Sequence, residues 1–297
     1  VVAGATVRLY DSNNNEIPVG PDGVLGTGDD APGGILTTAS GLYQFSNLPP
    51  GDYYITVTPP VAGYDATPVS GGDVDLNPSN TDNNGENVGG IIRSQVFTLT
   101  TGGETGDGDA LPNNNPSVDF GLAGYNLGNR VWADLNNTGE IDNGELGIPG
   151  VTVRLYASNG TTEINVGPDG ILGTADDMTG GMLTDANGYY LFQNLPAGDY
   201  IVRVATPLGY TSSTVDAGDP DTDVDDSDDN GSVLAAMTVS SQIVTLGPNA
   251  MEPTNEIDLA VTGQGGADNR SNMTVDFGFF QSLSVSNYVW YDTNNDG

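Results

Sequence analysis

The sequence predicts an all-β protein made of two tandem β-sandwiches of about seven strands each, joined head to tail. Apolar residues alternate with polar ones over short runs such as residues 151–155 and 200–204, and this period is typical of half-buried strands. Gly, Pro, Asn and Asp separate the runs, which is the turn chemistry of an all-β chain. No stretch has convincing helical periodicity.

An internal repeat is the third observation behind this prediction. Residues 5–30 match residues 151–177, and residues 40–57 match residues 187–204. A repeat of domain size indicates two copies of one fold. Shorter matches pair residues 94–99 with 241–246, 117–122 with 274–279, and 129–139 with 287–297.

The repeat defines the expected domains. The first β-sandwich covers residues 1–124 and lacks the first strand and the oxygen-rich loop that open the second, complete one, which covers residues 125–281. Residues 282–297 hold a first strand and the start of another loop. They either open a following tandem domain or complete the first domain of a neighbouring copy by strand addition. Both alternatives predict head-to-tail propagation, with tandem domains or neighbouring copies as partners.

Within the second domain, we expect strands where apolar residues alternate between turn signals. The first of them leads into an oxygen-rich loop, and the others are bounded by Gly, Pro, Asn or Asp. In chain order the expected strands are Leu127–Ala133, Val151–Tyr156, Met182–Asp185, Tyr189–Gln193, Asp199–Ala205, Ser241–Leu246 and Met273–Phe279. The expected core residues are Trp132, Leu155, Phe192, Leu195, Tyr200 and Phe277, with Leu9, Phe45, Leu48, Tyr53 and Phe120 in the first domain.

Composition excludes several classes of function. The net charge is −34, from 40 acidic residues against 6 basic ones, all of them Arg. Nucleic acid and an anionic membrane surface need a basic face, so neither is an expected partner. The absence of Cys, His and Lys removes disulfides, the usual zinc sites, thiol and imidazole catalysis and Schiff-base chemistry. No run of apolar residues is long enough to insert into a membrane.

The main loop, residues 134–145, has the spacing of a twelve-residue calcium loop. A hard cation takes six to eight oxygen ligands, and short acidic or amide side chains at alternate positions supply them around a glycine turn. Strand and turn residues flank this loop in place of helices. We predict a calcium loop that joins two strands, with a merely polar Asx-turn loop as the alternative. Its predicted ligands are Asp134, Asn136, Thr138, Glu140, Asp142 and Glu145.

Two further kinds of acidic loop are calcium candidates, so several Ca²⁺ ions are expected. The glycine loops, residues 20–30 and 167–177, are nearly identical, and the alternative is a tight hairpin with solvated aspartates. The acidic loop, residues 216–231, is either a calcium site or a solvated run of charge. Residues 185–188 form an ordinary turn without a ligand role. The candidate ligands are Asp22, Asp29, Asp30, Asp169, Asp176, Asp177, Asp226, Asp228 and Asn230.

The motif G-x-Y-x-F-x-x-L-x-x-G-x-Y at residues 188–200 resembles the Cna B-type family. With the V-W-x-D-x-N loop and the later V-D-F-G strand, the chain is most similar to the SdrD B-like repeats of the serine–aspartate repeat adhesins. The resemblance implies a prealbumin-like, Ig-like β-sandwich, calcium-dependent rigidity and a bacterial surface stalk that carries a ligand-binding head. It also implies that the D-x-N loop is the main calcium site, both in the main loop and at Asp292, Asn294 and Asp296.

The resemblance has one departure, because many Cna B-type domains carry a lysine–asparagine isopeptide bond and this chain has no lysine. We therefore expect calcium to supply the stiffness. The predicted function is that of a non-enzymatic structural module of an extracellular bacterial stalk, fibre or filament. The alternative is an adhesin module that binds a host or neighbouring-cell surface. A carbohydrate-active enzyme is a distant third, because it would need two carboxylates facing each other in a cleft.

Overall fold

The computed structural model describes residues 1–70, 74–75, 82–105, 111–142, 144–215, 218–225, 227–235, 237–247, 270–294 and 296. The described residues form twenty β-strands and no α-helix, so the all-β class is confirmed. The same described ranges contain no helix that is long and apolar enough to span a membrane. The chain forms two compact units: unit 1 consists mainly of residues 1–125 and unit 2 mainly of residues 126–297.

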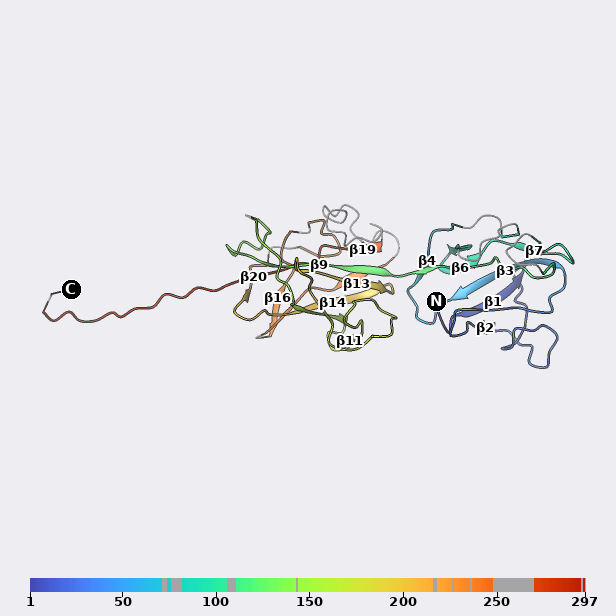
Figure 1. Ribbon diagram of the computed structural model, residues 1–297, viewed down its shortest axis with the longest axis horizontal. Coiled ribbons are helices and arrows are strands. Elements are labelled where there is room, and N and C mark those ends of the chain that lie inside the picture. The colour runs from blue at the N-terminus through green and yellow to red at the C-terminus, as the bar shows by residue number, and fades with distance from the viewer. Residues whose placement is uncertain are drawn as a thin grey trace. The chain divides into compact units, whose positions relative to one another are not determined.

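Unit 1 contains one large sheet and one small sheet (Figure 1). The strand order of the large sheet is β2-β1-β3-β6-β5, with β7 beside β3, and β4 pairs with β8 in the small sheet. The strands are β1 (Thr6–Asp11), β2 (Ile35–Leu36), β3 (Gly51–Thr58), β4 (Asp65–Ala66), β5 (Gly85–Val88), β6 (Ile91–Ser94), β7 (Phe97–Leu99) and β8 (Leu122–Ala123).

Unit 2 contains two larger sheets. One has the order β11-β10-β14-β17-β16, with β12 beside β10 and β18 beside β14, and the other has the order β13-β9-β20-β15, with β19 beside β9. The strands are β9 (Tyr125–Ala133), β10 (Thr152–Ala157), β11 (Glu163–Ile164), β12 (Met182–Leu183), β13 (Tyr189–Leu195), β14 (Gly198–Ala205), β15 (Thr211–Ser212), β16 (Ser232–Ala235), β17 (Thr238–Ser240), β18 (Val244–Leu246), β19 (Ser271–Asn272) and β20 (Phe277–Phe280).

Alternation explains how these strands build a core. In the antiparallel pair β10–β14, Val153 lies opposite Val204 and Leu155 opposite Val202, and all four side chains are buried. The polar residues between them point to the other face, as the period of a strand requires. The same pattern recurs in β1 and β3 of unit 1. The predicted pairing of apolar faces into two β-sandwiches is thereby confirmed.

A parallel pair closes the second sheet of unit 2. β9 runs beside β20, with Trp132 opposite Gly278 and Ala133 opposite Phe279. Trp132 is fully buried. A Cβ atom on Gly278 would lie 2.8 Å from the Trp132 indole, so only glycine leaves room for this ring. Since β9 and β20 are far apart in the sequence, this contact depends on the completed fold.

The expected strands of the second domain overlap strands of the structure, with differences at their ends. The expected strand Ser241–Leu246 is shorter, because only residues 244–246 are strand. Sequence reasoning missed β11, β15, β16, β17 and β19, which are two to four residues long. All four residues of β16 are exposed, so this strand lacks the apolar alternation by which strands are recognised.

The predicted core is confirmed in unit 2 and only partly confirmed in unit 1. All six residues expected in the second domain are buried. In unit 1, Leu9 and Tyr53 are buried, whereas Phe45, Leu48 and Phe120 are only half-buried. Their counterparts in unit 2 lie on β13 and β20, the two strands that flank β9. The described residues of unit 1 include no strand at the position of β9, which explains the difference.

Candidate metal-binding loops

Asp134 organises the first turn of the main loop, directly after β9. Its side chain is 1% exposed. Oδ1 accepts hydrogen bonds from the backbone N–H groups of residues 136–138 at 3.2, 2.5 and 3.3 Å, and Oδ2 accepts one from Gly139 at 3.0 Å. Gly139 has a φ of 85°, a conformation that glycine adopts at little cost. The carboxylate is therefore buried at the centre of a tight Asx-type turn.

Other predicted ligands of the main loop lie close together on this turn. Asn136 Nδ2 lies 3.2 Å from both carboxylate oxygens of Asp142, and Asn136 Oδ1 accepts a hydrogen bond from Thr138 Oγ1 at 3.0 Å. The half-buried Asp142 also faces the end of the loop. There the buried Glu145 accepts hydrogen bonds from Leu135 N at 2.6 Å and from Asp142 N at 3.2 Å. Glu145, the last residue of the loop, thus holds the end of the loop against its first turn.

The main loop also contacts the acidic loop from far along the chain. Glu140 and Asp228 form an antiparallel bridge, and Ile141 N donates a hydrogen bond to Ser227 O at 2.6 Å. The side chain of Glu140 is exposed. Asp226, another predicted ligand, lies outside the described residues. The backbone contact brings two predicted calcium loops to one end of unit 2.

Asn230 ties the acidic loop to the strand that carries the V-D-F-G motif. Asn230 Oδ1 accepts a hydrogen bond from Asp276 N at 2.6 Å, and Asp276 Oδ1 accepts one from Arg130 N at 2.8 Å. Asp276 is completely buried. Sequence reasoning treated V-D-F-G as an ordinary strand and missed this role. The signal was a charged side chain within an otherwise apolar strand.

Asp229 is a second residue that sequence reasoning missed. Its side chain is 0% exposed, and Oδ1 accepts hydrogen bonds from Gly231 N at 2.8 Å and Gly278 N at 3.2 Å. Oδ2 has no hydrogen-bond partner. Burial raises the pKa of Asp229 to about 7, the charge of Asp134 acts in the same direction, and the two N–H groups oppose it. A carboxylate at this depth is costly when ionised.

Unit 1 has asparagine in the place of Asp229. Asn83 Oδ1 accepts hydrogen bonds from Gly85 N at 3.0 Å and Gly121 N at 2.9 Å, which matches the pattern at Asp229. Asn83 Nδ2 additionally donates to Thr67 O at 2.6 Å and to Gly85 O at 2.8 Å. The neutral amide of Asn83 therefore has hydrogen-bond partners for both its oxygen and its nitrogen. Unit 2, which contains the main loop, has an ionisable aspartate at this place.

The two glycine loops have the same geometry in both units. Asp30 Oδ2 accepts a hydrogen bond from Gly26 N at 2.8 Å, and its counterpart Asp177 accepts one from Gly173 N at 2.9 Å. The remaining predicted ligands also accept hydrogen bonds within their own loops. Asp22 and Asp169 each accept a hydrogen bond from the backbone N–H two residues further along the chain. Asp29 and Asp176 each accept one from a threonine hydroxyl. This bond lowers the pKa of Asp176.

The C-terminal repeat of the D-x-N motif lies in an exposed segment. Asp296 N donates a hydrogen bond to Asp292 Oδ1 at 3.2 Å, and Asn294 Nδ2 donates to Asp296 Oδ2. This turn resembles the first part of the main loop.

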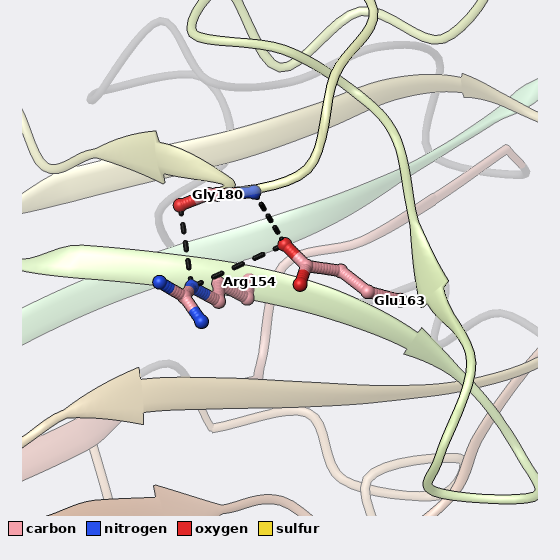
Figure 2. Close-up of polar contacts among 3 residues, drawn as sticks. All are labelled: Arg154, Glu163 and Gly180. Carbon is pink, nitrogen blue, oxygen red and sulfur yellow. Dashed lines mark hydrogen bonds and ion pairs between the residues drawn. The ribbon is translucent and has the colours of Figure 1, made fainter.

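A polar cluster at Glu163 anchors the end of the second glycine loop (Figure 2). Glu163 Oε1 accepts a hydrogen bond from Gly180 N at 2.6 Å and lies 4.0 Å from Arg154 Nε, which donates to Gly180 O at 3.3 Å. Glu16 forms the same bond to Gly33 N in unit 1, also at 2.6 Å. Each cluster attaches its loop to the edge of the large sheet.

Replacing this carboxylate is expected to loosen one glycine loop only. Glu163→Ala removes the acceptor of the Gly180 N–H, at a cost of about 1–3 kcal/mol. We expect faster hydrogen–deuterium exchange over residues 165–181 and unchanged exchange over residues 18–34, where Glu16 is intact. Glu163→Gln keeps an acceptor and should restore most of the protection. Equal acceleration in both loops would contradict this local role.

The donor set of the main loop fits a hard cation, since it offers carboxylate, amide, hydroxyl and backbone oxygens around one glycine turn. Over the described residues, no group of three or more Asp or Glu side chains is arranged to hold a metal ion. The carboxylates of Asp134 and Glu145 accept backbone N–H bonds instead. A cation would have to replace part of these hydrogen bonds. The chemistry available to the site is oxygen coordination, and calcium remains a prediction.

A family model and two curated relatives point to the same family. A family model described as SdrD B-like domain matches residues 125–261. The serine-aspartate repeat-containing protein D of Staphylococcus aureus (strain Newman) is 32% identical over 301 residues, covering 100% of this chain and 16% of that protein. The serine-aspartate repeat-containing protein F of Staphylococcus epidermidis is 31% identical over 272 residues, covering 90% of this chain and 12% of that protein.

The chain thus spans 16% or less of the length of these relatives. Among solved structures, GBS52, the minor pilin of the Gram-positive pathogen Streptococcus agalactiae, matches with 14% identity and a TM-score of 0.35. That match covers 97% of this chain and 87% of the pilin.

Proposed function

This chain belongs to the SdrD B-like domains, and from that premise we propose that it is a calcium-stiffened structural repeat of an extracellular bacterial stalk, fibre or filament. Its location is the bacterial cell surface, and its class is that of structural or adhesin modules of surface proteins. We propose the finer role as well: a non-enzymatic unit that propagates head to tail with neighbouring domains or copies. The ligand-binding adhesin module remains the alternative.

One observation carries the calcium part of the proposal. The main loop gathers five oxygen-bearing side chains on one turn, and two of them, Asp134 and Glu145, are buried although both are acids. Burying a carboxylate costs hydration free energy, which the backbone N–H bonds offset in part and a bound cation would offset further. The chain carries 34 more negative than positive charges, so bound calcium would relieve strong self-repulsion.

The residues of the main loop have distinct parts in this proposal. Asp134, Asn136 and Thr138 would supply side-chain oxygens, Glu140 its backbone carbonyl, and Glu145 the closing carboxylate. Asp134 follows β9 directly, so coordination there fixes the end of that strand. Calcium, when bound, supplies positive charge, and its binding energy becomes folding energy because the site is not formed in the unfolded chain.

Thermal unfolding of the 297-residue chain tests this function. With free calcium at 100 times Kd, each site should stabilise unit 2 by about 2.7 kcal/mol, which raises Tm by several degrees. EGTA should reverse the shift, and magnesium should not replace calcium. Isothermal titration calorimetry on the same sample should count several ions.

Matched variants separate the main loop from ordinary acidic turns. Glu145→Gln should remove most of the calcium-dependent shift of unit 2. Asp185→Asn is the control, because Asp185 Oδ1 also accepts two backbone N–H bonds, at 2.8 Å each, in a turn without a predicted ligand role. If Tm does not change on addition of calcium and the chain retains no ion, the proposal is overturned and the adhesin alternative remains.

A further inference from the structure

The few basic residues of the chain are concentrated on the outer faces of the two large sheets. The chain has six arginines and no other basic residue, against 40 acidic residues. Four of the six lie on strands of these sheets, namely Arg8 on β1, Arg93 on β6, Arg154 on β10 and Arg203 on β14. Each of them lies between two buried residues of its strand, so its side chain points away from the core.

In unit 2, two of these arginines lie directly opposite each other. The antiparallel register of β10 and β14 pairs Arg154 with Arg203. Side chains at such positions have Cβ atoms about 4.5–5.5 Å apart, and two like charges there are destabilising. Further across the sheet, Ser240 on β17 lies opposite Arg203, and Ser232 on β16 lies opposite Ser240. We call these four residues the arginine row.

Unit 1 has the matching row without a pair of like charges. There Thr56 on β3 lies between Arg8 and Arg93, because it is opposite Arg8 on one side and opposite Arg93 on the other. The next residue across the sheet from Arg93 is Glu86 on β5. In unit 1 a neutral residue thus separates the arginines and the row ends on an acid. In unit 2 the arginines are adjacent and the row ends on serines.

The guanidinium group of Arg203 forms no ion pair with a described residue. Its Cζ lies 4.3 Å from the centroid of the Tyr156 ring, and a Cβ atom on Gly160 would lie 3.1 Å from its Nη2. Its Nε is buried without a hydrogen-bond partner. Asp199 lies on the same face of β14, about 14 Å along the strand. Tyr156 and Gly160 therefore hold this cation in place without a counter-charge.

Arg154 is engaged at one nitrogen only. Its Nε donates to Gly180 O at 3.3 Å and lies 4.0 Å from Glu163 Oε1, and these contacts leave its two terminal nitrogens unused (Figure 2). The side chain is 47% exposed. A planar guanidinium binds an oxyanion through two parallel N–H bonds. The terminal N–H groups of Arg154 are thus open to a ligand on the outer face of the sheet.

We propose that the arginine row of unit 2 binds the phosphate groups of a flexible polyanion outside the cell. Two guanidinium groups suit a phosphate, because its tetrahedral oxygens can accept hydrogen bonds from both at once and its charge offsets the repulsion between them. The exposed Ser232 adds a hydroxyl donor. The hydroxyl of Ser240, which donates to Ser241 O at 3.1 Å, can rotate toward the same ligand.

The dimensions of the arginine row favour a polymer over a single small anion. Neighbouring strands lie about 4.8 Å apart, so a row across four strands is about 14 Å long. The row lies on the open face of a sheet, whereas small ligands are usually enclosed in a concave site. Two arginines do not form the broad basic face that nucleic acid or a membrane surface needs. A flexible chain of phosphates laid across the strands therefore fits the row best.

The net charge of −34 opposes the approach of any anion at long range. At 0.15 M ionic strength the Debye length is about 8 Å, so carboxylates farther away are largely screened, whereas direct contacts with the row are not. Phosphate binding adds a ligand to the structural role of the chain. It does not depend on calcium in the main loop.

Isothermal titration calorimetry of the 297-residue chain with short-chain polyphosphate, in EGTA and at physiological ionic strength, tests the arginine row. We expect binding that Arg203→Gln weakens at least about tenfold, because one of two charged contacts is lost. Arg203→Lys keeps the charge but not the planar fork, so its affinity should lie between the two. Arg93→Gln is the matched control, because Arg93 Cζ also lies over a tyrosine ring, 3.6 Å from the centroid of Tyr54, but faces Glu86. Its affinity should be unchanged.

Inorganic phosphate is the second titrant and should bind much more weakly than polyphosphate at equal phosphate concentration. For Arg203→Gln, the slope of log K against log salt concentration should decrease by about one. If Arg203→Gln does not fold, Arg154→Gln takes its place with the same expected loss. Absence of polyphosphate binding, or an equal loss in Arg93→Gln, would overturn the site. Equal affinity for inorganic phosphate would overturn the polymeric ligand.

Discussion

Trp132→Ala is expected to destabilise unit 2 by about 3–5 kcal/mol. The side chain is fully buried and packs against Gly278, which has no side chain that could move into the space left. The substitution therefore removes a large apolar surface from the core and leaves a cavity. Trp132→Phe should cost less, because Trp132 Nε1 makes no hydrogen bond that would be lost. Calorimetric unfolding at low protein concentration measures both effects.

Trp290→Ala is the matched control for this experiment. These are the two tryptophans of the chain, and Trp290 is exposed. An exposed substitution is expected to change stability by no more than about 0.5 kcal/mol. The transition of unit 1 should not move in either variant. A cost below about 1 kcal/mol for Trp132→Ala would contradict the packing of β9 against β20.

Asp229→Asn is expected to stabilise unit 2 at pH 8 by up to about 4 kcal/mol. The pKa of Asp229 is raised from 3.8 to about 7 in the folded chain, chiefly by burial. The folded state therefore binds this proton more tightly than the unfolded state. The stability that protonation contributes is fully present below about pH 4 and is lost as the pH rises through about 7. Asparagine removes the charge and keeps the shape.

Unit 1 supplies the reciprocal variant. Asn83 occupies the matching place and donates from its amide to two backbone carbonyls. Asn83→Asp should destabilise unit 1 at pH 8 and much less at pH 4. Urea unfolding in EGTA at both pH values measures the two variants without competition from a cation. If Asp229→Asn stabilises unit 2 equally at pH 4 and pH 8, ionisation of Asp229 is not the cause.

The features that the sequence predicted correctly depend on residues close together in the chain. Alternation over residues 151–155 and 200–204 located β10 and β14, and the spacing within the main loop brought Asn136 and Asp142 together. Burial of a ring such as Phe45 was not predictable, because it depends on whether a distant strand pairs beside it. The apolar pattern of residues 43–48 is the same in either case.

The buried polar network was also beyond sequence reasoning. Asp276 accepts a hydrogen bond from Arg130, 146 residues away in the chain, and Asp229 accepts one from Gly278, 49 residues away. Only the finished sheet brings these groups together. Calcium in the main loop is a different case, since the donor residues lie on one turn but coordination itself is still a prediction.

The parallel pairing of β9 with β20 decides how unit 2 responds to tension along the chain. β9 comes first and β20 last among the paired strands of this unit. Pulling on the two ends of the unit draws β9 and β20 in opposite directions along their common axis, which loads their hydrogen bonds in shear. Bonds loaded in this way share the force and must break together, whereas an antiparallel hairpin pulled at its open end would unzip one bond at a time.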